Sequence, residues 1–144
     1  MTRTIKKLAI LGCMIGCALP GQLRAEPITA LPAADLAWER TPEGVAFAPL
    51  IGNRFAGPYM AMVQLPAGLV SPPHVKSADM FGVMVSGAMI HVPAGTDPSD
   101  GARLFSGAFY RIPAGVPHVS SCVSDEDCVT FLYQDGKFDF LPVQ

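Results

Sequence analysis

The sequence lacks the patterns of several large classes of protein. After residue 26 there is no helix-length segment with apolar residues at a period of about 3.6, which argues against all-α and α/β folds. There is no glycine-rich phosphate loop and no nucleotide-binding motif. The chain has only 3 histidines, and no serine stands at a recognisable nucleophile turn. Nucleotide-dependent and triad-type chemistry are therefore not expected.

Basic residues are scarce outside the N-terminal region. Residues 1–25 carry four Lys or Arg and no acidic residue, while the whole chain has 10 Lys and Arg against 12 Asp and Glu. Residues 26–144 therefore keep six basic residues against all 12 acidic ones, a net charge of −6. Because an acidic surface repels nucleic acid and anionic membranes, we expect neither as a partner.

Residues 1–25 are typical of a cleaved signal peptide. A cationic start precedes the apolar run 8–19, which is too short to span a bilayer, and Ala25 offers a small residue at a cleavage site. This pattern predicts bacterial export to the periplasm or the medium, with no membrane attachment after cleavage. A lipid anchor at Cys17 is the open alternative. The mature residues 26–144 are enough for one domain.

Cysteine is almost absent from the mature region. Two of the 4 cysteines lie in the signal segment, which leaves Cys122 and Cys128 on either side of an acidic loop. In an oxidising compartment such a lone pair is expected to form a disulfide. The competing interpretation, a metal-binding pair, needs further Cys or His nearby, and only His118 is close in sequence.

Short apolar runs separated by Pro, Gly and Asp predict an all-β sandwich or barrel. The expected strands cover residues 46–52, 58–65, 80–87, 88–92, 108–112, 128–134 and 138–143, with 35–40 as the first candidate. Pro-Ala-Gly turns follow three of the runs, at 66–68, 93–95 and 113–115. In the run 80–86 both faces are largely apolar, which favours packing on a second sheet or subunit and hence a homodimer.

Two of these turns lead to histidines at motif-like spacings. Residues 68–87 follow the pattern G-x5-H-x-K-x3-M-x6-G, and residues 107–122 follow G-x5-P-x-G-x2-H-x3-C. With these spacings the sequence resembles the cupin superfamily, within which its stretches SADMFGVMVSG and YQDGKFDFLPV look like a small exported branch. The superfamily has His, Glu and Asn where this chain has Lys76, Met80 and Cys122.

The resemblance implies a single antiparallel β-barrel of jelly-roll type with both motif histidines inside it. Metal-bearing cupins hold Fe, Mn, Zn, Ni or Cu with three His and one Glu, of which only His74 and His118 remain here. Asp79 would replace the missing Glu only through a register slip that reverses the faces of its strand. The Met80 thioether with the two imidazoles would suit copper, although Met80 also fits simple core packing.

Lys76 opposes a metal at this place, because its ammonium would repel the ion within a few ångströms. The sequence therefore predicts no tightly held cofactor, with one divalent transition metal or copper as the alternative. The remaining candidates are less defined. His91 is expected at a surface or an interface, while Gln64 and Tyr133 are candidates for lining the ligand cavity.

Three functions follow from these residues. The first is a binding module that holds a small polar or anionic molecule through His74, Lys76 and His118, with Gln64 and Tyr133 at the cavity wall. The second is a metal-dependent oxygenase, isomerase or lyase, with both histidines as ligands and Lys76 as acid or base. The third is a structural protein whose barrel is filled. A resemblance in fold does not choose among them.

Overall fold

The strands form two antiparallel sheets in a computed structural model that describes residues 25–143. The predicted signal peptide, apart from Ala25, and Cys17 lie outside the described residues. Contacts divide the chain into a short unit, Met1–Ala30, and a larger unit, Leu31–Gln144, which holds all the strands described here. No helix among the described residues is long and apolar enough to cross a membrane.

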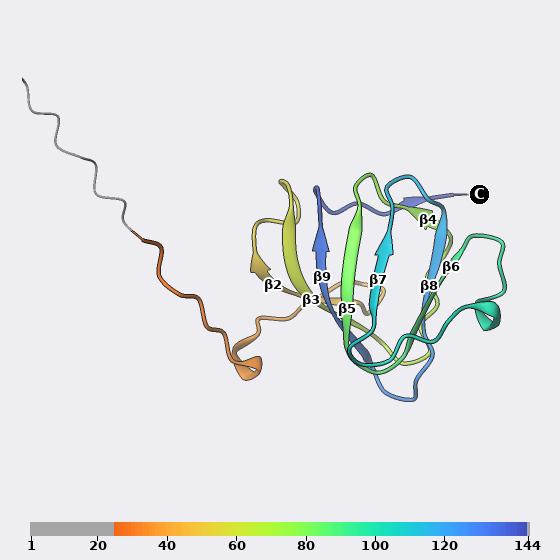
Figure 1. Cartoon of the computed structure of the whole chain (residues 1–144), viewed down its shortest axis with the longest axis horizontal. Helices are drawn as coiled ribbons and strands as arrows, with labels where there is room; N and C mark the ends of the chain where they lie inside the picture. The colour runs from red at the N-terminus through yellow and green to blue at the C-terminus, as the bar shows by residue number, and fades with distance from the viewer. Residues whose placement is uncertain (1–24, 144) are drawn as a thin grey trace, which may run out of the picture. The chain divides into compact units, whose positions relative to one another are not determined.

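The larger sheet has six strands and the smaller sheet has four (Figure 1). The order in the larger sheet is β1 (Glu39–Arg40), β2 (Ala46–Ile51), β3 (Tyr59–Leu65), β9 (Cys128–Gln134), β5 (Met80–Ser86) and β7 (Phe109–Ile112). The order in the smaller sheet is β10 (Leu141–Pro142), β4 (His74–Val75), β8 (His118–Cys122) and β6 (Met89–Pro93). Two short 3-10 turns, η1 (Ala33–Asp35) and η2 (Pro98–Asp100), complete the elements.

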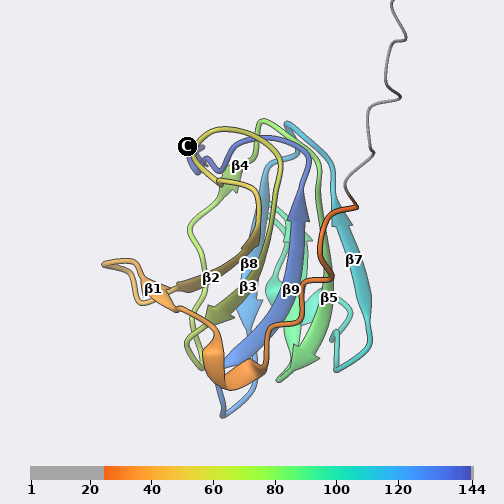
Figure 2. The same ribbon diagram turned by 90° about the vertical axis from the view of Figure 1, so that its left-hand side faces the viewer.

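The prediction of an all-β antiparallel fold is confirmed, but the described strands do not close into one hydrogen-bonded barrel. They remain two sheets, connected by chain crossings such as the one from β4 to β5. One reason is β4, which is only two residues long. It follows Pro72 and Pro73, which have no N–H to donate to a ladder. Figure 2 shows the C-terminal residues running beside β4, where β10 pairs with it.

The core lies between the sheets, and strand alternation places it there. Along β3 the residues Tyr59, Ala61, Val63 and Leu65 are buried, while the residues between them are only half-buried. The strands β5 and β9 alternate in the same way. Gly82 has no side chain on this inner face because the ring of Tyr110 fills the space: a Cβ there would lie 2.2 Å from that ring.

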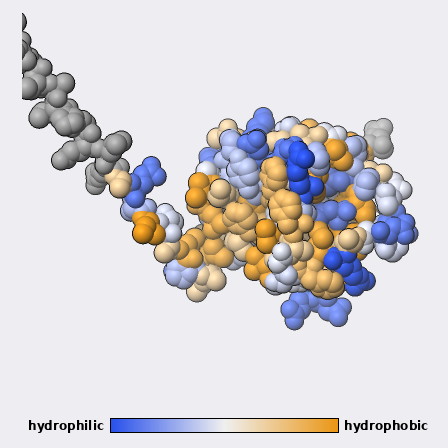
Figure 3. Space-filling model, viewed as in Figure 1, coloured by the Kyte–Doolittle hydropathy of each residue, from blue (hydrophilic) through white to orange (hydrophobic). Residues whose placement is uncertain are grey.

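The outer face of the larger sheet is also apolar. Its partly exposed residues come from four neighbouring strands in register: Met60, Met62, Phe81, Val83, Val85, Phe109, Val129 and Phe131. Figure 3 shows apolar side chains gathered over β9, β5 and β7. Val83 and Phe109 are 39% and 62% exposed, and no other described residue covers them. The homodimer expected from the two apolar faces of β5 stays a prediction.

The expected disulfide joins the two sheets. Cys122 ends β8 in the smaller sheet and Cys128 begins β9 in the larger one, and their sulfur atoms are bonded. Both residues are buried at the edge of the core. The acidic loop between them is therefore a covalently closed turn that ties the end of one sheet to the start of the other.

Removing this bond should lower stability without changing the fold. The double variant Cys122→Ala, Cys128→Ala opens a loop of seven residues and should lower the free energy of unfolding by about 2 kcal/mol. Urea unfolding of the variant and of the wild type would measure the difference. The wild type in reducing agent should lose a comparable amount, and unchanged unfolding midpoints in both cases would contradict a stabilising role for the bond.

Candidate functional site

A cavity of about 620 Å³ lies between the two sheets. Its walls are mainly apolar: Val45, Phe47, Val63, Leu65, Leu69, Val70, Met80, Met89, Leu132, Phe138 and Phe140. Nitrogen-bearing side chains reach the cavity from the smaller sheet, namely Lys76, His74 and His91. Hydroxyl groups of Tyr59, Tyr110 and Thr130 line it on the larger sheet, and Glu43 lines it from the loop before β2. Apolar walls with a few convergent polar groups are typical of sites that bind small molecules, whose volumes are about 300–1,000 Å³.

The two motif histidines face each other across a strand pair. His74 on β4 lies directly opposite His118 on β8, and their ring centres are 4.2 Å apart. The same local geometry orients both rings. Nδ1 of His74 lies 2.9 Å from the carbonyl oxygen of Pro72, and Nδ1 of His118 lies 2.9 Å from that of Val116. The structure thus brings together the pair that the motif spacings predicted.

These carbonyls decide which ring nitrogen carries the proton. A carbonyl oxygen only accepts, so Nδ1 of each ring must be the donor, and Nε2 of the neutral ring is left with a lone pair. Nε2 of His118 is buried and makes no hydrogen bond. Burial, and to a lesser extent the charge of Lys76, lower the pKa of His74 to about 4, and the same two causes lower the pKa of His118. Both imidazoles are therefore neutral near pH 7.

Lys76 follows β4 and is almost fully buried, at 5% exposure. Its ammonium donates a hydrogen bond to the backbone carbonyl of Asp139. It also lies 4.3 Å from the ring centre of Phe138 and 5.4 Å from that of Phe140, within range of cation–π attraction. Burial lowers the pKa of Lys76 to about 8, an effect that the nearby charge of Asp139 partly opposes. The lysine stays largely cationic near pH 7.

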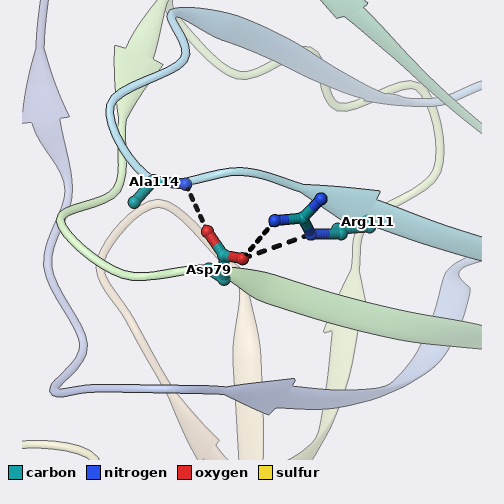
Figure 4. Close-up of polar contacts among 3 residues, drawn as sticks. All are labelled: Asp79, Arg111 and Ala114. Atoms are coloured by element: carbon teal, nitrogen blue, oxygen red, sulfur yellow. Dashed lines mark hydrogen bonds and ion pairs between the residues drawn. The ribbon is translucent and has the colours of Figure 1, made fainter.

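Asp79 does not turn toward the histidines, so the register slip is absent. Its carboxylate accepts hydrogen bonds from the Arg111 guanidinium at 2.5 Å and from the Ala114 backbone N–H at 2.8 Å (Figure 4). These hydrogen bonds, that from Ala114 first, hold the pKa of Asp79 below its ordinary value. The contact ties the start of β5 to the turn that precedes His118. Asp79 therefore positions this turn and is not a ligand.

The side chains present do not fit a four-ligand metal site. Met80 is buried and lines the cavity, as expected from its place in the motif, but it brings no carboxylate. Among residues 25–143 there is no group of three or more His, Cys, Asp or Glu arranged to hold a metal ion. The buried ammonium of Lys76 would repel a divalent ion held by His74 and His118. These side chains would therefore bind a hard metal such as iron or manganese only weakly.

His91 was expected at a surface or an interface, and this expectation is wrong. Its ring lines the cavity, with Nδ1 2.8 Å from Oγ of Ser120 and the ring centre 4.3 Å from that of Tyr110. Nε2 of His91 is buried without a hydrogen-bond partner. Burial, with smaller contributions from His118 and His74, lowers the pKa of His91 to about 4. His91 lies opposite Ser120, which is on the same face of β8 as His118. This pairing between strands places His91 on the cavity side, and the sequence alone does not reveal it.

Gln64 and Tyr133 lie away from the cavity. Both are on the outer face of the larger sheet, since the residues on either side of them in β3 and β9 are the buried ones. The amide of Gln64 donates to Asp127 at 2.8 Å, and the hydroxyl of Tyr133 donates to Asp135 at 2.9 Å. The structure does not bring these two residues to the histidine pair. The aromatic residues that do reach the cavity include Tyr59, Tyr110, Phe138 and Phe140.

Comparisons with known proteins agree with the motif spacings. Residues 28–137 match the model of the family described as the ChrR cupin-like domain. None of the curated proteins matches the chain. Many solved structures share the fold, which confirms the resemblance to cupins.

Three of these structures illustrate the likeness. KdgF from Halomonas sp. is 18% identical with a TM-score of 0.60, over 76% of this chain and 94% of that one. The polyketide cyclase RemF from Streptomyces resistomycificus is 17% identical with a TM-score of 0.63, over 82% and 87%. A chain from the complex of Rhodobacter sphaeroides SigE with the anti-sigma ChrR is 19% identical with a TM-score of 0.55, over 72% and 51%. At such identities the likeness concerns the fold alone.

The buried lysine predicts a particular dependence of stability on pH. The pKa of Lys76 is about 8 in the folded chain against 10.5 ordinarily, so between these values the unfolded chain binds more protons and stability rises with pH. Relative to Lys76→Met, the free energy of unfolding of the wild type should rise by about 2 kcal/mol between about pH 7.5 and about pH 9.5. Urea unfolding at several pH values would measure this.

The matched control is Lys137→Met, which removes an exposed lysine next to Phe138, one of the C-terminal residues that contact Lys76. Its free energy of unfolding should run parallel to that of the wild type over this pH range. A parallel profile for Lys76→Met as well would mean that the lysine is not desolvated in the folded chain.

Proposed function

This chain belongs to the family of ChrR cupin-like domains, and we propose that it binds a small anionic molecule with a largely apolar body in the cavity between its sheets. The observation that carries the proposal is the buried ammonium of Lys76 at the wall of a mainly apolar cavity. Lys76 occupies the motif position where cupins with a metal place a ligand to it. A fixed positive charge from the protein thus stands where a metal ion would supply one.

The charge of Lys76 is only partly compensated within the described residues. Its hydrogen-bond partner is a backbone carbonyl, and the two ion pairs, Arg54 with Glu39 and Arg111 with Asp79, lie elsewhere. The nearby carboxylate of Asp139 attracts the ammonium without forming an ion pair with it, so part of the desolvation cost remains, and an anionic ligand would offset more of it. An ammonium has three N–H donors, so the bond to Asp139 leaves capacity for a carboxylate oxygen.

The apolar walls indicate the rest of the ligand. Phe138 and Phe140 flank the ammonium, and Phe140 also stacks on His74 with ring centres 3.9 Å apart. A flat or aromatic body would lie against these rings and the Met80 and Leu132 side chains opposite. The volume of about 620 Å³ also argues against the third hypothesis, a filled barrel.

Export of this binding domain is part of the proposal. The residues of the signal segment 1–25 support it, and cleavage near Ala25 would release the domain 26–144. The disulfide between Cys122 and Cys128 is in keeping with an oxidising compartment, such as the periplasm or the medium. Sequencing the N-terminus of the protein recovered from the periplasm or the medium would test the cleavage site.

A metal-dependent enzyme is the second candidate, and one observation favours it. Both motif histidines are held through Nδ1 by a carbonyl, which is the arrangement that orients metal-ligating histidines and leaves Nε2 free. The donor set is otherwise poor, because Met80 and Lys76 stand in place of two ligands. Copper, which accepts a thioether, fits these residues better than iron or manganese. We rank this candidate below the binding protein.

Binding of a simple aromatic acid would test the first candidate. Phenylacetate should raise the unfolding temperature of the wild type, while its neutral analogue phenylacetamide should not. Calorimetry should show at least about tenfold weaker binding of phenylacetate to Lys76→Met, because the variant lacks the cation that pairs with the carboxylate. Lys137→Met should bind as the wild type does. Equal affinities for wild type and Lys76→Met would refute the role of Lys76.

Metal content would test the second candidate. Lys76→His rebuilds the His-x-His pair, and elemental analysis should find more transition metal in this variant than in the wild type, both from metal-supplemented growth without chelators. Lys137→His controls for a new surface histidine and should match the wild type. Equal, negligible metal in all three proteins would mean that position 76 does not face the point where Nε2 of His74 and His118 converge. A content of about one transition-metal ion per chain in the wild type would instead favour the metal-dependent enzyme.

A further inference from the structure

Four nitrogen-bearing side chains form a row across the smaller sheet. Lys76 and His74 come from β4 and its end, His118 from β8 and His91 from β6. His74 lies opposite His118, while Pro93 lies opposite His118 and His91 opposite Ser120. His91 and His118 are therefore diagonal neighbours, roughly 7–8 Å apart. The row faces the apolar inner face of the larger sheet across the cavity.

The row divides into one cation and a set of hydrogen-bond acceptors. Nδ1–H of His74 and of His118 is already donated to a backbone carbonyl, so each ring offers only Nε2. A second positive charge on these rings, beside each other and beside Lys76, would be repelled. Nε2 therefore presents a lone pair. Nε2 of His74 makes no hydrogen bond within the described residues and, unlike that of His118, is not sealed from the cavity.

A ligand whose only polar group is a carboxylate cannot pair with both Lys76 and Nε2 of His74. An oxygen anion next to Lys76 is attracted, but one next to the lone pair on His74 is repelled. A bound ligand would bury Nε2 of His74, and a polar atom buried without a partner is costly, so the ligand should bring a donor for Nε2. An ammonium group on the ligand would be repelled by the charge of Lys76, so the donor should be neutral, and a hydroxyl is the simplest neutral donor that can stand next to a carboxylate.

We infer that the ligand is a hydroxy acid with an apolar, aromatic-sized body: its carboxylate pairs with the ammonium of Lys76 and its hydroxyl donates to Nε2 of His74. Lys76 and His74 share one face of the same short segment, so the two groups of the ligand are adjacent, as in a 2-hydroxy acid. The stack of His74 on Phe140 holds the acceptor in place. This inference rests on the proposed function and specifies its ligand class.

Three acids of similar size separate the contributions of the carboxylate and the hydroxyl. Phenylacetate has the carboxylate alone, mandelate adds the hydroxyl, and 2-methoxy-2-phenylacetate replaces the hydroxyl proton by a methyl group. Calorimetry with the full mature chain should show mandelate binding about tenfold more tightly than phenylacetate, and the methoxy acid no more tightly than phenylacetate. The His74→Phe variant keeps an aromatic ring against Phe140 and lacks the acceptor. It should bind mandelate and phenylacetate equally.

Each outcome decides between the two proposals. Equal affinities of the wild type for mandelate and phenylacetate overturn the hydroxy-acid inference and leave the binding proposal standing. A preference for mandelate that survives in His74→Phe also overturns it, since the hydroxyl would then have another acceptor. If neither acid binds at millimolar concentration, the binding proposal itself fails. A cooperative urea unfolding transition of His74→Phe without ligand, with a midpoint near that of the wild type, would show that the variant is folded.

Discussion

The pairing of His74 with His118 across β4 and β8 is the contact on which the site depends. It is the one residue pair that joins these two strands, because the two prolines before β4 shorten it. The surroundings compensate for so small a ladder. β10 pairs with the other side of β4, the Asp79 contact with Ala114 secures the turn before β8, and the disulfide secures the end of β8. Constraints on all sides thus hold two imidazoles at a fixed separation.

The second constraint is the desolvation of Lys76. The lowering of its pKa from 10.5 to about 8 corresponds to roughly 3 kcal/mol that the folded chain spends on keeping this side chain charged. One carbonyl, the nearby charge of Asp139 and the faces of Phe138 and Phe140 offset only part of the lost hydration. A structural role does not need such a charge, since methionine would fill the same space without that penalty. The cost is understandable if an anion recovers it on binding.

Much of the fold and part of the site could be predicted from the sequence, for different physical reasons. The longer strands show alternation or continuous apolar runs, so β2, β3, β5, β6, β7 and β9 were expected where they occur. β4 and β8 were missed as strands because both are polar and preceded by proline, and β4 has only two residues, although motif spacing found their histidines. His91, Gln64 and Tyr133 were misjudged for one reason. Alternation separates two faces of a strand, but only register with distant strands tells which face is inside, and here the outer face is apolar too.

Lys76 and Met80, which stand where metal-bearing cupins have ligands, together change the kind of ligand that the site would bind. A metal held by histidines and a carboxylate presents a ligand with positive charge alone, so an anionic oxygen satisfies it. The site here presents one cation, Lys76, beside the unshared electron pairs of neutral imidazoles. Its complement must therefore carry an acceptor and a donor side by side, and a ligand with only one of them leaves a buried polar group unpaired. Because unpaired groups in an apolar cavity cost more than paired ones gain, the site that we propose would select among anions where a metal would not.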